Sequence, residues 1–322
     1  MIIQGYSIDF FRNIKGYKSP RFMTFAEKNE LKNKIISSIS KEKLDLKYLP
    51  NCLFDSKEIE NLADNNLLSF DFPQNADVAV LFEPAGDKVI KINDLEHITI
   101  SGYTNDNPIK KYEEVNTLAA NLEKDLNFQH DRQFGYLTNE LPLCGNGFIV
   151  DTLVHVPALL YSGKLMYTIN KLLRRPGTLM IPYSERDTKS AFFIIRCISK
   201  TEPYRDIKTI QNMAEEISVR EETEVKDLME NDDLMNLLTT RAEALKKGDA
   251  INNTNFMKAL DDYVFYRKLV GEVVTPKQIE KILTDAKKYE RVLEKTMDNM
   301  NMSEVSKNYY DILFSFKEEA NA

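Results

Sequence analysis

Residues 134–159 read FGYLTNELPLCGNGFIVDTLVHVPAL and carry the strongest fold information in the chain. The middle of this stretch is rich in proline, glycine and asparagine, which predicts a loop. The apolar run Phe148–Val156 predicts a strand. Pro157 suits the first position of a helix, because its missing amide hydrogen has no partner to lose there. A loop, a strand and a helix are therefore expected in direct succession.

The residues before this stretch predict a mixture of helix and hairpin. Thr24 followed by Glu27 forms a capping box, which indicates the start of a helix. Two short apolar runs separated by a proline- and glycine-containing segment are typical of a hairpin. The predicted elements are a helix over 24–40, strands over 78–82 and 88–92 with their turn at 84–87, a strand over 97–101, and a helix over 111–126.

The residues after segment 134–159 are predicted to be mostly helical. A strand is predicted over 191–199, and beyond Pro203 the apolar residues recur at helical spacing. A second capping box at residues 275–278 starts a further helix, within a segment that reads as helical from Phe256 to Phe316. The apolar positions of the first helical stretch are Ile207, Ile210, Ala214 and Ile217. The predicted fold class is α+β, with an antiparallel sheet flanked by helices in residues 1–247 and a small all-helical domain in residues 248–322.

The composition is that of an ordinary globular chain. It has 322 residues, of which 43% are hydrophobic and 29% charged, so it can bury a full core without disulfides or metals. The net charge of -7 disfavours binding to nucleic acid or to anionic membranes. No apolar run is long enough to cross a membrane, and the N-terminus does not resemble a signal peptide. We expect a cytoplasmic protein with no nucleic-acid or membrane partner.

Few residues suggest chemistry on their own. The three cysteines, Cys52, Cys144 and Cys197, are far apart and odd in number, which indicates neither a disulfide framework nor a metal site. His97 and His155 lie among apolar residues of predicted strands, where a hydrogen-bonded core histidine is the ordinary interpretation. The glycines of segment 145–147 could hold an anion through backbone N–H groups, although such a loop is more often a turn. These features leave the function open.

Four segments resemble motifs of the ATP:guanidino phosphotransferases, in the same order along the chain. Segment 134–159 resembles FGYLT-x-CP-x-N-x-GT-x-x-R followed by HLPAL, with matching spacing. Segment 92–100 resembles VNEEDHLRI, segment 6–16 resembles an arginine-rich N-terminal motif, and segment 198–200 resembles ISN. The helical C-terminal part is similar to that of the bacterial protein-arginine kinases. The resemblance covers essentially the whole chain and implies the guanidino-kinase fold.

The family holds the phosphates of ATP with arginines and positions the guanidinium group with a glutamate and a cysteine. Here the arginine positions of the family fall on Ser7, Asp9, Thr99 and Ile149, and a further one falls near Pro182. Only Arg12 of the N-terminal motif is retained. The guanidinium-binding positions fall on Leu95, between Asp94 and Glu96, and on Glu140, which precedes Leu141 at the proline position, and a loop glutamate corresponds to Asp187. His97 and His155, which lie near the adenine in the family, are both present and imply a residual adenine site.

This pattern of losses predicts a pseudokinase with a binding or regulatory role, no catalytic residues, no cofactor and no metal. Each arginine–phosphate bond contributes about 1.5–3 kcal/mol, so losing several forfeits on the order of 10 kcal/mol. The expected partners are a second copy of the chain, bound through the C-terminal helices, and an active arginine kinase or the protein-quality-control machinery. One alternative is a purely structural dimer. The other is a divergent active phosphotransferase with phosphate contacts rebuilt from Lys88, Lys91, Arg132, Arg186 or Arg196.

Overall fold

The computed structural model describes residues 3–50, 78–83, 88–172, 176–183, 191–200, 202–247, 256–272 and 275. The strands are β1 Ile3–Arg12, β2 Lys47–Pro50, β3 Ala79–Phe82, β4 Lys88–Ile92, β5 Ile98–Thr104, β6 His130–Asp131, β7 Gly135–Tyr136, β8 Phe148–His155, β9 Thr178–Pro182 and β10 Phe192–Ser199. The helices are α1 Phe25–Ser40, α3 Pro108–Leu126, α4 Pro157–Tyr161, α5 Leu165–Leu172, α6 Pro203–Met229, α7 Asp232–Lys247 and α8 Phe256–Leu269. Short 3₁₀ turns lie at Pro20–Phe22 (η1) and Leu141–Leu143 (η3).

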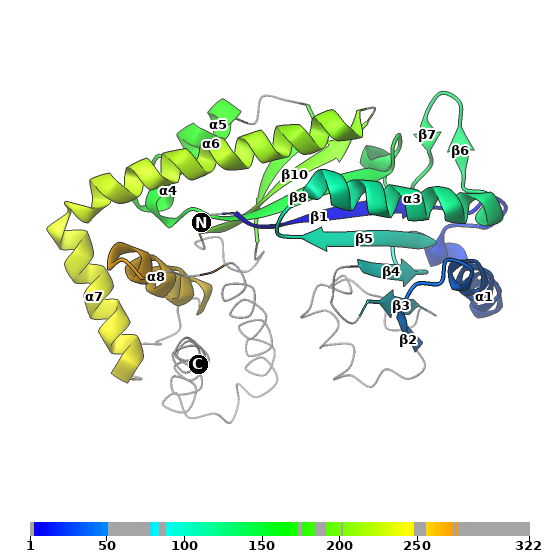
Figure 1. Cartoon of the computed structure of the whole chain (residues 1–322), viewed down its shortest axis with the longest axis horizontal. Coiled ribbons are helices and arrows are strands. Elements are labelled where there is room, and N and C mark those ends of the chain that lie inside the picture. The colour runs from blue at the N-terminus through cyan, green and yellow to red at the C-terminus, as the bar shows by residue number, and fades with distance from the viewer. Residues whose placement is uncertain are drawn as a thin grey trace. The chain divides into compact units, whose positions relative to one another are not determined.

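The main sheet has eight strands in the order β2-β3-β4-β5-β1-β8-β10-β9. The pairs β2–β3, β3–β4, β4–β5 and β1–β5 are antiparallel. The predicted hairpin is confirmed as β3 and β4, while its turn at 84–87 lies outside the described residues. The strand and helix predicted around Pro157 are confirmed as β8 and α4. The antiparallel sheet with flanking helices confirms the predicted fold class (Figure 1).

The chain divides into two compact units. The first unit is Gly5–Asp151 with Arg196–Gln211, and the second is Met1–Gln4, Thr152–Ile195 and Asn212–Ala322. Strands β8 and β10 each contribute residues to both units. The boundary predicted from sequence near residue 248 lies outside the described residues and stays a prediction.

Local capping signals explain where the helices of the first unit begin. The predicted capping box starts α1: Thr24 Oγ1 accepts from the Glu27 amide at 3.3 Å, and Glu27 Oε2 accepts from the Thr24 amide at 2.7 Å. Helix α3 begins at Pro108, three residues before the predicted start, because the Asn107 side chain caps it by accepting from the Lys110 amide. Helix α3 lies alongside β5 and β1 in Figure 1, and its Tyr112 ring packs 5.7 Å from the ring of Phe10.

The second unit has a core formed by α4, α7 and α8. Its buried apolar residues are Ala158, Leu234, Leu238, Phe265 and Leu269. The stripe predicted along α6 is confirmed, since all four of its apolar residues are at most 2% exposed. Residues 276–278 of the second predicted capping box, and the segment after them, lie outside the described residues. No helix in the described ranges combines the length and the hydropathy needed to span a membrane.

Candidate functional site

Polar side chains on four neighbouring strands of the first unit form one group. We name it the polar row: Ser101 on β5, Asp9 on β1, Asp151 on β8 and Arg196 on β10. Asp9 pairs directly with Ser101 in the β1–β5 register, so these two side chains share a face of the sheet. Along β1 the half-buried Ser7 and Asp9 alternate with the buried Ile8 and Phe10, which pack on the opposite face.

Asp9 is held by hydroxyl groups. Ser7 Oγ donates to Asp9 Oδ2 at 2.8 Å, and Ser101 Oγ donates to Asp9 Oδ1 at 2.5 Å. Tyr103, which pairs with Ser7 across the β1–β5 ladder, lies beside them. Burial raises the pKa of the Tyr103 hydroxyl, and the negative charge of Asp9 raises it further. The Tyr103 hydroxyl therefore stays neutral at physiological pH.

Asp151 and Arg196 form a two-pronged ion pair at the other end of the row. Arg196 Nε donates to Asp151 Oδ1 at 2.9 Å, and Arg196 Nη2 donates to Asp151 Oδ2 at 2.7 Å. Burial raises the pKa of Asp151, against the opposing effect of Arg196. The bonds to Asp151 raise the pKa of Arg196, which stays cationic. The row thus carries two carboxylates against one guanidinium group, and that group is already paired.

Most of the positions aligned with phosphate-binding arginines come together around this row. Ser7 and Asp9 belong to its face, and Thr99 pairs across β1–β5 with Phe11 on the same face. Thr99 is 2% exposed and Ile149 is 5% exposed, so neither side chain reaches solvent. Pro182 ends β9 in the second unit, and Asp187 lies outside the described residues.

Arg12, the one retained arginine of the N-terminal motif, is buried and structural. It is 4% exposed, and its guanidinium carbon lies 3.7 Å from the centre of the Tyr136 ring. Its Nη1 donates to the carbonyls of Phe11, Asn146 and Gly147 at 2.8–3.0 Å. Burial lowers its pKa to about 10. The glycine loop is therefore a backbone partner of Arg12, which is the turn-like role weighed from sequence.

The positions aligned with guanidinium binding also lie together. Leu95 is 42% exposed, and its carbonyl accepts from Asn139 Nδ2 at 2.6 Å. Its neighbour Glu96 is 1% exposed and accepts from the Asn139 amide at 2.9 Å and from Asn13 Nδ2 at 2.5 Å. Burial raises the pKa of Glu96 to about 7, and the nearby charge of Glu140 adds to this shift. The positions aligned with guanidinium binding thus hold an exposed leucine next to a buried carboxylate that is already hydrogen-bonded.

His97 and His155 are both core residues and lie in different units. His97 Nδ1 accepts from the Ile14 amide at 2.8 Å, and Nε2 bonds to the Lys18 carbonyl at 2.6 Å. His155 is 0% exposed and stacks on Phe192 with the ring centres 4.2 Å apart. Both rings are closed to solvent, so the core-histidine interpretation describes their geometry. The adenine site, which needs an exposed ring face, stays a prediction without support from these contacts.

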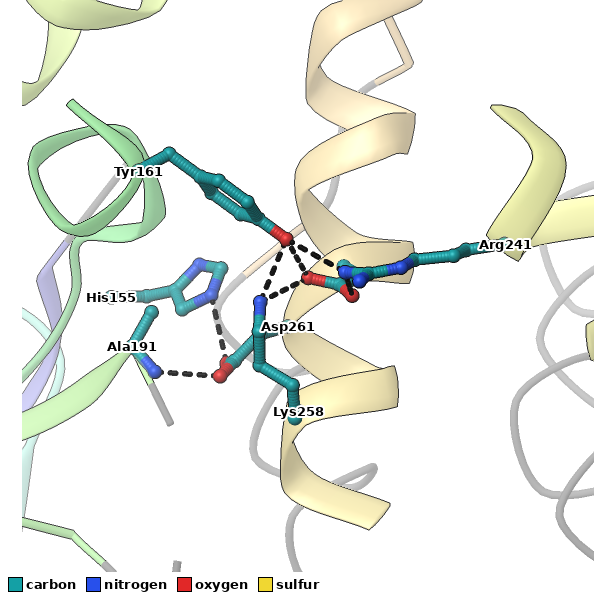
Figure 2. A network of polar contacts seen from close by, with 7 residues as sticks. His155, Tyr161, Ala191, Arg241, Lys258 and Asp261 are labelled. Atoms are coloured by element: carbon teal, nitrogen blue, oxygen red, sulfur yellow. Dashed lines mark hydrogen bonds and ion pairs between the residues drawn. The ribbon is translucent and has the colours of Figure 1, made fainter. Parts of the chain in front are cut away.

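Sequence reasoning missed a second polar network, which lies in the second unit (Figure 2). Asp261 Oδ2 accepts from the Ala191 amide at 2.6 Å, and Asp261 Oδ1 lies 3.3 Å from His155 Nε2. Next to it, Tyr161 and Asp262 bond to each other, and both bond to Arg241 and Lys258. In the part of the chain that the structure describes, no group of three or more histidine, cysteine and acidic residues is placed to hold a metal ion.

The amino-acid sequence is similar to a known protein family and to several characterised proteins. Residues 27–181 match the model of the ATP:guanido phosphotransferase, C-terminal catalytic domain. A protein-arginine kinase of Clostridium perfringens is 24% identical over 179 residues, covering 55% of this chain and 53% of that protein. A protein-arginine kinase of Chlamydia pneumoniae is 29% identical over 114 residues, covering 35% of this chain and 32% of that protein. The matched region spans about half the length of the first of these relatives.

Solved structures share the fold. A lombricine kinase superposes with a TM-score of 0.60 at 14% identity, covering 69% of this chain and 66% of that chain. The substrate-free duplicated taurocyamine kinase of Schistosoma mansoni superposes with a TM-score of 0.59 at 14% identity, covering 80% of this chain and 38% of that chain. At this level of identity the likeness concerns the fold alone.

Proposed function

The chain belongs to the ATP:guanido phosphotransferase family, and from that premise we propose that it is a pseudokinase with a binding or regulatory role. One observation carries the proposal: Ser7, Asp9 and Thr99, on the face of the polar row, stand at positions where the resemblance implies cationic phosphate contacts. Transfer of a phosphoryl group depends on positioning and on cancelling the developing negative charge. Two carboxylates and one paired guanidinium group supply the opposite charge balance.

The burial of two of the aligned arginine positions supports the same conclusion. A phosphate group must reach its protein donors directly, and Thr99 and Ile149 are almost fully buried. Asp9 lies on the same face and would repel a polyphosphate in a partly desolvated site. An arginine at any of these positions would attract the nucleotide, whereas the residues present do not.

The positions aligned with guanidinium binding support the pseudokinase proposal independently. The apolar side chain of Leu95 neither orients a guanidinium group nor accepts a proton from it. Glu96, the adjacent carboxylate, is buried, and its oxygens are committed to Asn139 and Asn13. A carboxylate held in this way cannot turn outward without breaking three hydrogen bonds.

The direct test is a phosphotransfer assay. The purified chain is incubated with labelled ATP, magnesium and either free arginine or an arginine-rich protein, beside an active protein-arginine kinase. We expect no acid-labile phosphate above the blank from this chain, while the active enzyme labels its substrate. Clear turnover by the chain would refute the pseudokinase proposal.

Lys91 favours a second candidate function, a divergent active phosphotransferase. Lys91 pairs with Thr99 across β4–β5, which puts its side chain on the face of the polar row. Within the described residues it forms no ion pair, whereas Lys88 bonds to Glu83 at 2.8 Å and Arg196 bonds to Asp151. Arg186, another candidate cation, lies outside the described residues. If the wild-type chain transfers phosphate from ATP and Lys91→Met abolishes that transfer, the second candidate is the correct one.

The partner of the pseudokinase is proposed from family analogy alone. An active arginine kinase of the same cell, or the protein-quality-control machinery that such kinases serve, is the partner we propose. An intact paralogue encoded nearby would favour the regulatory role. Co-purification of the tagged chain with that paralogue tests it, and two proteins that elute separately at equal concentration would contradict it.

A further inference from the structure

Asp151 contacts Arg196 in the way that a bound oxyanion would. The guanidinium group of arginine presents parallel N–H donors that match a carboxylate or a phosphate equally well. Two of these donors, on Nε and Nη2, are engaged by the two oxygens of Asp151. The Arg196 side chain remains 32% exposed, so an anion from solvent can approach it.

We propose that Arg196 is the centre of an oxyanion site that the Asp151 carboxylate occupies from within the chain. A phosphate- or sulfate-type anion then binds at Arg196 only when Asp151 is neutral or absent. The proposal rests on the proposed function, in which the face of the polar row is closed to ATP. It adds the reason for the closure, which is competition by a carboxylate of the chain itself.

The surroundings of Arg196 provide further groups for such an anion. The hydroxyls of Ser7, Ser101 and Tyr103 lie on the same face and now surround Asp9. The charge of Asp151 reaches the Tyr103 hydroxyl and helps to raise its pKa, so Tyr103 is a further donor close to an anion that Arg196 would bind.

Protonation of Asp151 is the natural way to open the site. The charged and titratable groups around the Asp151–Arg196 pair are Asp9 on β1, Tyr103 on β5 and Glu140 in the loop before β8. Burial raises the pKa of Asp151 above that of an ordinary aspartate, and the charge of Asp9 adds to the shift. As the pH falls, Asp151 becomes neutral before an exposed aspartate does, and Arg196 loses its internal anion.

Sulfate is the probe for the test, because its charge stays constant from pH 5 to 8. Titration calorimetry measures sulfate binding to the full-length wild type, to Asp151→Asn and to the double variant Asp151→Asn with Arg196→Gln. At pH 7.5 we expect Asp151→Asn to bind sulfate at least about ten-fold more tightly than wild type, a difference of about 1.4 kcal/mol. The double variant should lose this gain. A folded Asp151→Asn protein without any gain would overturn the proposal.

Two matched variants separate competition from a general charge effect. Glu216→Gln frees Arg220, its ion-pair partner on α6 at 2.7 Å, without altering the polar row. Asp9→Asn removes a charge from the row but leaves the Asp151–Arg196 pair intact. Neither should gain sulfate binding at pH 7.5, and a gain equal to that of Asp151→Asn in either one would overturn the proposal.

A pH series covers the case in which Asp151→Asn fails to fold. Wild type should bind sulfate more tightly as the pH falls from 7.5 to 5, and Arg196→Gln should not. Equal pH dependence in both proteins would refute the proposal. The proposed function fails on a different result, namely turnover of ATP by the wild type at neutral pH, so the two failures are distinguishable.

Discussion

The Lys268 side-chain nitrogen Nζ, on α8, lies 3.0 Å from Nδ1 of His155, on β8. Because Nδ1 accepts this hydrogen bond, the ring proton is placed on Nε2, which faces Asp261 Oδ1 at 3.3 Å. Asp261 in turn accepts from the Ala191 amide next to β10. Figure 2 shows His155, Asp261 and Ala191 in this arrangement. Helix α8 is therefore joined to the sheet strands of the second unit by a buried chain of polar contacts.

Lys268 also balances a buried carboxylate on α6. Glu221 is 1% exposed and accepts from the amides of Ala158 and Leu159 at the start of α4. Burial raises the pKa of Glu221 and lowers that of Lys268, while the attraction between the two opposes both shifts. Removing one partner leaves the other as an uncompensated buried charge. We expect Lys268→Met to lower the free energy of unfolding by about 3 kcal/mol at pH 7, as measured by urea denaturation.

The double variant Lys268→Met with Glu221→Gln is the control for this first prediction. It removes both charges and keeps an amide oxygen that can accept from the start of α4. It should therefore be more stable than Lys268→Met alone. A loss in the double variant equal to the sum of the losses in Lys268→Met and Glu221→Gln would show that the two charges do not interact.

Arg12→Lys should destabilise the chain although it preserves the charge. Lysine has neither the planar group that stacks on Tyr136 nor the geometry to reach the carbonyls of Phe11, Asn146 and Gly147 together. We expect a loss of about 2–3 kcal/mol in the free energy of unfolding, measured by urea denaturation. Arg220→Lys on α6, where the half-buried arginine pairs only with Glu216 one turn earlier, is the control and should change stability by less than about 0.5 kcal/mol. Equal effects would contradict the structural role of Arg12.

Glu96 should make stability depend on pH between the unfolded and folded pKa values of its carboxyl group. Its folded pKa is raised from 4.5 to about 7, so folding favours the protonated form. The contribution of Glu96 to stability is complete below about pH 4.5 and is lost as the pH rises through about 7. In Glu96→Gln this loss is absent. The stability of wild type relative to Glu96→Gln should therefore fall between pH 5 and 8, in urea denaturation at each pH, and a constant difference would contradict the assignment.

Local signals explain the part of the fold that could be predicted from the sequence. The capping residues Thr24 and Glu27 are three positions apart, and Pro157 marks a helix start by its own chemistry. Strand β1 was not predicted, and the orientation of Arg12 was missed with it. In a strand, side chains alternate between faces, so Arg12 points away from the face that holds Ser7 and Asp9. The strand periodicity of residues 3–12 was the signal that could have shown this.

The site depends on contacts that no local pattern reveals. Asp151 and Arg196 are 45 residues apart in the sequence, and only the order of β8 and β10 in the sheet brings them together. Asp261 and Lys268 look like ordinary charges of an exposed helix until α8 packs against β8 and α4. Charged residues on a helix surface and charged residues in a buried network have the same sequence pattern, because burial is decided by tertiary packing.

We expect the full chain to be a homodimer. The dimer is predicted because the segment from Phe256 to Phe316 is rich in large apolar residues. Two of them, Phe265 and Leu269, are buried against Ala158, Leu234 and Leu238 of the same chain. Tyr266 packs against the same cluster. The other large apolar residues of the C-terminal segment, from Ile282 to Leu313, lie outside the described residues. Light scattering of the full chain at about 50 micromolar should give twice the monomer mass, and a monomer mass would refute the dimer. The fragment 1–247 is a poor control, because it lacks α8 and exposes the core that α8 covers.

Restoring arginine at Ser7 and Asp9 tests the correspondence with the phosphate-binding positions of the family. Both side chains are half-buried on the face of the polar row, whereas Thr99 and Ile149 are enclosed and would resist enlargement. The double change converts a repulsive carboxylate and a neutral hydroxyl into two cations beside the sheet. The variant should bind ATP with magnesium, while wild type should not.

Thermal unfolding with millimolar ATP and magnesium measures this difference. Ligand present at ten times its Kd stabilises a protein by about 1.4 kcal/mol, which corresponds to a rise of roughly 2–6 °C in Tm for a protein of this size class. Wild type, with a Kd above the ligand concentration, should shift by much less. A control with Glu222→Arg and Thr240→Arg adds the same charge at exposed positions of α6 and α7 and should behave like wild type. If the folded Ser7 and Asp9 variant shows no shift, or if the control shifts equally, these two residues do not occupy the phosphate-binding positions.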